Sequence, residues 1–147
     1  MRILYLFACP LLALAQAPDM PEGNGREIIQ RTCTKCHDAF HYATVFATRP
    51  TWEKTIDTMI QRGANLPDAA ARDTVINYFA RFFGVTANVN DDTAKELETK
   101  LEIPQAEAEA IVKYREANDY FRTYRDLRAV PGLDITRLDP IKQRLRY

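Results

Sequence analysis

The sequence has no excess of charge of either sign, because its 20 lysines and arginines equal its 20 aspartates and glutamates. A protein whose overall field attracts nucleic acid or an anionic membrane surface needs a clear excess of basic residues. The composition therefore excludes binding that is driven by net charge. With 147 residues, the chain has room for one ordinary domain or two small ones.

Long apolar runs are also scarce. The run from Ile3 to Leu14 is too short to span a bilayer, and a single basic residue, Arg2, precedes it. Small residues follow at positions 13, 15 and 17, which is the order typical of a secretory signal peptide. We predict a signal peptide over residues 1–15, cleaved after Ala15, because cleavage after Ala17 would place Pro18 beside the scissile bond.

Two alternatives remain for this segment. One is an apolar N-terminal helix that stays in the core, and the other is a lipid anchor at Cys9. Removal of the signal peptide leaves no transmembrane segment in the mature chain, and we expect an exported, periplasmic protein.

Cysteine is rare, and the mature chain keeps only Cys33 and Cys36, so no disulfide framework is expected. They belong to the pentapeptide C-x-x-C-H that ends in His37, which is typical of covalent haem attachment. Two thiols at this spacing can form thioethers with the two vinyl groups of one porphyrin. Histidine is the usual proximal ligand of haem iron. The motif predicts one haem c, anchored by Cys33 and Cys36 and ligated by His37.

Two other interpretations of C-x-x-C are a redox-active dithiol and half of a zinc site. The dithiol would require a βαβ pattern around the motif, which is not visible. The zinc site would require a second pair of ligands, and His41 is the only other histidine.

Helical periodicity surrounds the motif. We expect an extended leader over residues 18–24 and helices over residues 25–32, 52–62 and 69–83. Trp52, Ile56, Met59 and Ile60 share one helix face, and Gly63 ends that helix. We expect the wall of a haem crevice to be formed by Phe40, Tyr42, Val45 and Phe46.

This segment resembles class I cytochromes c, and most closely the single-haem modules attached to periplasmic dehydrogenases. The pattern W-x-x-x-[hydrophobic]-x-x-M-x-x-[RK]-G-A-x-L stands here as Trp52, Ile56, Met59, Arg62, Gly63, Ala64 and Leu66. The resemblance covers about 65 residues. It implies a haem domain over residues 16–87 that carries single electrons. It also implies redox proteins as donor and acceptor, for example a periplasmic dehydrogenase.

The distal side of the haem has two interpretations. Met59 is the proposed distal iron ligand, since the other mature methionine, Met20, precedes the motif. An open distal position would instead suit a haem enzyme or a gas sensor. His41, four residues after His37, would lie on the proximal side of the ring. Arg49, Trp52 and Arg62 are the candidates to hold the haem propionates by hydrogen bonds.

The C-terminal part has a different pattern. A linker over residues 85–90 is followed by expected helices over residues 94–101, 106–118 and 124–130, and by a last helical stretch that is interrupted near Pro140. The order resembles the tandem helix-hairpin-helix domain of exported competence DNA receptors and of a photosystem II extrinsic subunit. The matching positions are Val89, Asn90, Asp92, Ala94, Leu97, Ile103, Ala106, Ala110, Ile111, Tyr114, Arg115, Phe121, Asp126, Leu127, Val130, Gly132, Leu133 and Leu138.

The two hairpins are poorly suited to DNA. DNA-binding members of this class place small residues where backbone N–H groups contact a phosphate. Here the first hairpin has Glu102 and Pro104 at those places, and the second has Gly132 beside Asp134. Residues 88–109 carry seven acids and two bases, whereas residues 110–147 carry nine bases and five acids. A concentrated basic face is therefore lacking.

We expect an all-α protein in which a monohaem cytochrome c domain is followed by a helix-hairpin-helix domain over residues 88–147. The second domain is predicted to dock on a protein partner, and the alternative is a DNA-binding protein that carries a haem domain. No catalytic constellation is visible, so we predict an electron carrier or an electron-transfer subunit of a dehydrogenase, not an enzyme.

Overall fold

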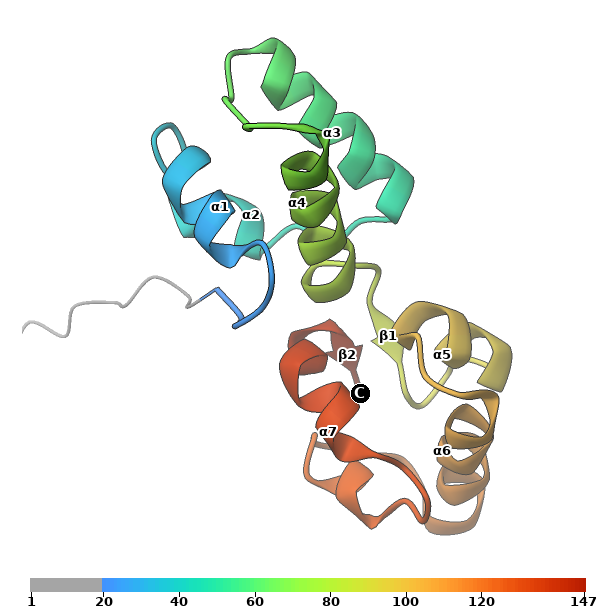
Figure 1. Cartoon of the computed structure of the whole chain (residues 1–147). Coiled ribbons are helices and arrows are strands. Elements are labelled where there is room, and N and C mark those ends of the chain that lie inside the picture. Colours follow the sequence, from blue (N-terminus) through green and yellow to red (C-terminus); the bar gives the residue numbers. More distant parts are fainter. Residues whose placement is uncertain (1–19) are drawn as a thin grey trace, which may run out of the picture.

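The computed structural model describes residues 20–147, so the predicted signal peptide and Cys9 lie outside the described residues. The fold is all-α, as predicted, and two very short strands are the exception (Figure 1). The α-helices are α1 (Arg26–Thr32), α2 (Ala39–Ala43), α3 (Arg49–Gln61), α4 (Ala69–Phe82), α5 (Ala94–Leu101), α6 (Gln105–Asn118) and α7 (Ile135–Leu138). The remaining elements are the 3₁₀ helices η1 (Asp126–Ala129) and η2 (Asp139–Arg144) and the strands β1 (Ala87–Asn88) and β2 (Leu145–Arg146). Within residues 20–147, no helix is both long enough and apolar enough to cross a membrane.

The first half of the chain is built around α4. Helices α3 and α1 both pack against it, and Figure 1 shows α3 and α4 as neighbouring antiparallel helices. Helix α3 begins at Arg49, earlier than predicted, because the Thr48 hydroxyl accepts the N–H of Thr51 and Pro50 occupies the first turn. Gly63 follows the end of α3 with φ +102°, a backbone conformation that favours glycine. The predicted helix end is therefore confirmed.

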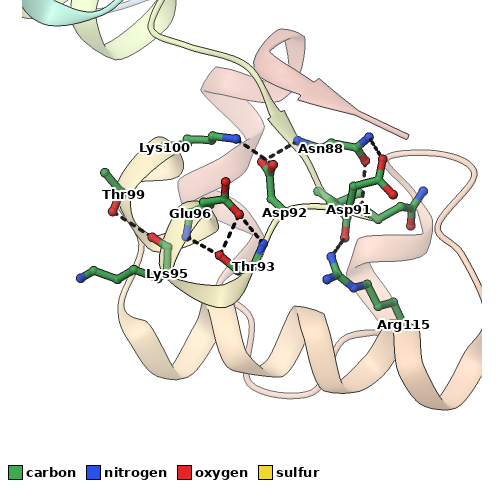
Figure 2. A network of polar contacts seen from close by, with 11 residues as sticks. Asn88, Asp91, Asp92, Thr93, Lys95, Glu96, Thr99, Lys100 and Arg115 are labelled. Carbon is green, nitrogen blue, oxygen red and sulfur yellow. Dashed lines mark hydrogen bonds and ion pairs between the residues drawn. The ribbon is translucent and has the colours of Figure 1, made fainter.

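The second half begins with a network of hydrogen bonds (Figure 2). The Thr93 hydroxyl accepts the Glu96 N–H while the Glu96 carboxylate accepts the Thr93 N–H, which forms a capping box at the start of α5. Lys100 on α5 donates to Asp92 at 2.7 Å, and Arg115 on α6 donates to the Val89 carbonyl oxygen at 2.7 Å. These contacts hold residues 89–92, which follow β1, against the first helical hairpin, α5–α6.

The predicted linker over residues 85–90 is wrong. Strand β1 pairs in parallel with β2 at the C-terminus, with Ala87 opposite Leu145, and both Ala87 and Val89 are fully buried. The pairing is decided by a partner almost 60 residues away, and no local pattern encodes it. The predicted boundary between residues 87 and 88 consequently falls inside a strand.

The predicted helix over residues 124–130 is also wrong in length and type. Only the 3₁₀ helix η1 forms there, because the Asp126 carboxylate accepts the N–H groups of Arg122 and Thr123 and so closes a turn ahead of it. These hydrogen bonds also hold the pKa of Asp126 below its usual value.

Candidate functional site

The C-x-x-C-H motif forms a single helical turn that continues from α1. The Cys33 N–H donates to the Ile29 carbonyl at 2.7 Å, and the His37 N–H donates to the Cys33 carbonyl at 3.1 Å. Both cysteines are free thiols. The turn, residues 33–37, therefore presents two thiols and an imidazole from a compact piece of backbone.

The turn borders an apolar cavity, which we call the haem cavity because the sequence motif predicts a haem beside it. The cavity holds about 810 Å³ of empty space, a figure that includes its open mouth. The predicted residues that line it are Cys33, His37, Tyr42, Val45, Trp52, Ile56 and Met59. Its walls come from the motif turn, from α2, and from the packed pair α3 and α4.

Met59 and the motif turn border the same space from different helices. Cys33, His37 and Met59 line both the haem cavity and an adjoining hollow that also includes Cys36 and Arg62. The structure thus brings together the two cysteines and both proposed iron ligands. Two thiols for covalent attachment, an imidazole for the proximal position and a thioether for the distal position surround an apolar cavity, so these residues fit a haem c group.

His41 lies beside His37. The two imidazole rings are stacked, with centroids 4.5 Å apart and planes 9° apart, and both line the haem cavity. The expectation that His41 would lie on the proximal side of the haem ring stays a prediction.

The three candidates for the propionates differ in what the structure leaves available. The Trp52 indole N–H donates to the Phe83 carbonyl at 2.9 Å, so Trp52 contributes its ring to the cavity wall and has no N–H left for a propionate. Arg49 donates to the Asn77 side chain and lies 3.8 Å from a carboxylate oxygen of Glu53. Arg62 is exposed beside the adjoining hollow.

Arg62 makes no ion pair within residues 20–147. Of the three candidates, its guanidinium is the one best placed to meet a propionate.

Of the other predicted wall residues, Tyr42 and Val45 line the cavity, while Phe46 packs near the Phe83 ring at 6.4 Å between centroids. The side chain of Phe40 lies outside what the structure describes.

Met20 has a structural role that its place in the sequence does not indicate. Its sulfur accepts a hydrogen bond from the Tyr42 hydroxyl at 3.6 Å, and both side chains are buried. Burial is the main cause that raises the pKa of Tyr42, which keeps this hydroxyl protonated as a donor. Met20 does not line the haem cavity, but it contacts Tyr42, which does. Met20 and Tyr42 are 22 positions apart, so no local sequence pattern predicts their contact.

Burial raises the pKa of the Cys33 thiol, and the nearby Cys36 raises it further. We therefore predict that in the haem-free, reduced protein iodoacetamide alkylates Cys33 severalfold more slowly than the exposed Cys36 near about pH 8, since the thiolate is the reactive form. The Cys33 rate should continue to rise as the pH is increased. Peptide mass spectrometry over time measures both rates. Equal rates at every pH would contradict the buried environment of Cys33.

The two hairpins of the second half have few backbone donors for a phosphate. Pro104 stands immediately before α6 and has no N–H, and Glu102, two residues earlier, adopts φ +56°. In the second hairpin the Asp134 N–H donates to the buried carboxylate of Glu107 at 3.4 Å, which also pairs with Arg137. This N–H group is therefore already bound to a carboxylate of the protein itself.

The chain is all-α, and its part after residue 83 is built from two helical hairpins. This arrangement is typical of helix-hairpin-helix proteins. Comparison with known proteins agrees, because residues 83–146 match the family model described as the helix-hairpin-helix motif. The chain therefore contains a helix-hairpin-helix region. No curated protein and no solved structure shows significant similarity to the chain.

Proposed function

We propose that this protein is an exported monohaem c-type cytochrome that carries single electrons and docks on a protein partner through its helix-hairpin-helix region. The observation that carries the proposal is the shared lining of the haem cavity by Cys33, His37 and Met59. Cys33 and Cys36 would hold the group covalently, and His37 and Met59 would ligate its iron. Bound haem would supply a one-electron Fe(III)/Fe(II) couple.

The residues around the cavity suit a carrier better than an enzyme. Trp52 stacks on Phe79 with ring centroids 4.6 Å apart, and Ile56 and Val75 are buried beside them. An apolar wall excludes water, and hydrophobic surroundings tune the redox potential of a metal group.

Met59 decides between the carrier and the alternative of an open iron site. We predict that the haem-loaded Met59→Ala protein, once reduced, binds carbon monoxide rapidly, whereas the unchanged protein binds it slowly or not at all, because the thioether occupies the distal position. Stopped-flow absorbance measures both rates.

Met20→Leu is the matched control for Met59→Ala, since Met20 lies behind the cavity wall. It should behave like the unchanged protein. If the unchanged protein bound carbon monoxide as fast as Met59→Ala, the carrier would be ruled out in favour of a haem enzyme or gas sensor.

Docking on protein is favoured over DNA binding by the hairpins. The missing N–H of Pro104 and the occupied N–H of Asp134 remove two donors on which phosphate binding in this class depends. Export follows from the predicted signal peptide and from the attachment chemistry, which the resemblance places outside the bacterial cytoplasm. A periplasmic dehydrogenase is the donor that the resemblance favours.

A further inference from the structure

A second cavity lies where the two halves of the chain meet, and we call it the junction cavity. It holds about 430 Å³ of empty space including its mouth, and it is lined by Arg81, Leu101, Glu102, Arg137, Ile141 and Arg144. Arg81 belongs to α4 of the first half, whereas the other residues come from α5, its hairpin, α7 and η2. Three of the six side chains are guanidinium groups, and one is a carboxylate.

Arg144 is the central residue of the junction cavity. It is only 3% exposed, yet within residues 20–147 no carboxylate lies within ion-pair distance of it. Its guanidinium donates to the carbonyl oxygens of Val85 at 3.2 Å, Arg81 at 2.6 Å and Lys100. These bonds use three of its five N–H groups, which leaves two.

A buried charge is costly unless other charges or dipoles compensate it. The carbonyls of Arg81 and Lys100 belong to the last turns of α4 and α5, and the helix dipoles there compensate part of the positive charge. Burial lowers the pKa of Arg144, the charge of Glu102 raises it and the charge of Arg81 lowers it further, so the carbonyls and Glu102 together offset the buried charge only in part. A negatively charged group beside the remaining N–H groups would complete the compensation.

The other charges of the junction cavity add to the same field. Arg81 is exposed, stacks over the Phe82 ring at 5.6 Å, and makes no ion pair in the described part of the chain. Arg137 is already paired with Asp134 at 3.2 Å and Glu107 at 3.4 Å. Glu102 is the lining carboxylate and opposes an anion. Arg81 and Arg144 are therefore the two cations available to a ligand.

We propose that the junction cavity binds a small oxyanion of the phosphate or sulfate class, held by Arg144 and Arg81. The empty space of the junction cavity is about half that of the haem cavity, about 430 Å³ against about 810 Å³ with their mouths included, which favours a small ion over a larger ligand. The bound ion would join the ends of α4 and α5 to η2. It would thereby stabilise the contact between the two halves.

Thermal unfolding of the full mature chain tests this site, with inorganic phosphate as the probe and sodium chloride at equal ionic strength as the reference. At about ten times its Kd, phosphate should raise the midpoint by about 3–5 °C. Arg81→Gln should abolish most of this shift, because it removes one cation without touching the carbonyl that Arg144 binds. Glu102→Gln should lower the Kd for phosphate severalfold, because it removes the opposing carboxylate.

Arg125→Gln is the matched control, since Arg125 is exposed elsewhere on the second half and does not line the junction cavity. It should keep the full shift. Phosphate also stabilises proteins without a site by exclusion from their surface, and that effect would be equal in all variants. If phosphate raised the unfolding midpoint equally in every variant, or no more than chloride does, the proposal would be overturned. The result would then be an adventitious ion only.

Discussion

Exported protein in which both Cys33 and Cys36 are replaced by serine is expected to be colourless, with no mass added to the mature chain. The hydroxyl of serine does not form the thioether that the thiol forms, and the two thiols are the only covalent anchors proposed for the haem. The unchanged protein should carry one covalently bound haem that survives denaturation. Visible absorbance and intact-protein mass measure the difference.

Cys9→Ser is the matched control for the double variant. Cys9 lies within the predicted signal peptide, so its replacement should leave colour and mature mass unchanged. The single variants Cys33→Ser and Cys36→Ser should each retain one possible thioether and attach haem less completely. A double variant that still carried covalent haem would refute the assignment of both anchors.

Trp52→Ala is expected to lower the free energy of unfolding by about 3–5 kcal/mol, the usual cost of removing a large buried aromatic ring. Trp52 is 4% exposed, stacks on Phe79 and lines the haem cavity, so its loss enlarges that cavity into the core. For a chain of this size, the midpoint of thermal unfolding should fall by about 10 °C. Calorimetry or urea denaturation of the haem-free protein measures the change without a contribution from the cofactor.

Trp52→Phe separates the ring from its hydrogen bond. The Phe83 carbonyl keeps a second donor, the Ala47 N–H at 3.0 Å, so it does not become an unsatisfied buried group. The phenylalanine variant should therefore lose only about 1 kcal/mol. If both variants were equally destabilised, the hydrogen bond and not the ring would carry the contribution of Trp52.

Some features could be predicted because they depend on neighbouring residues. The helix face of Trp52 and Ile56 follows from a 3.6-residue period, and the end of α3 follows from Gly63. The haem motif can be located in the same way, because the positions of Cys33, Cys36 and His37 are set by one turn of backbone. The lining of one cavity by both His37 and Met59 agrees with the predicted ligand pair, which stays a prediction.

Other features could not be predicted because their partners are remote in the chain. The sequence suggests that the Trp52 N–H is available to a propionate, whereas in the structure it donates to the carbonyl oxygen of Phe83, 31 residues later. Glu107 gave no signal of its contact with the Asp134 N–H, 27 residues later. Neither contact produces a periodic pattern in the sequence, because a single hydrogen bond constrains only two positions.

The amino-acid sequence by itself determined the helical character of this protein, the turn that presents two thiols and an imidazole, and the ends of its main helices. Each of these depends on backbone propensity and on side chains within about one or two turns of one another. The tertiary structure alone decided the pairing of β1 with β2, the support of Tyr42 by Met20, and the burial of Arg144 against carbonyls 44 to 63 residues away. Such contacts form only when the whole chain packs, because their free energy must first offset the entropy of closing long loops.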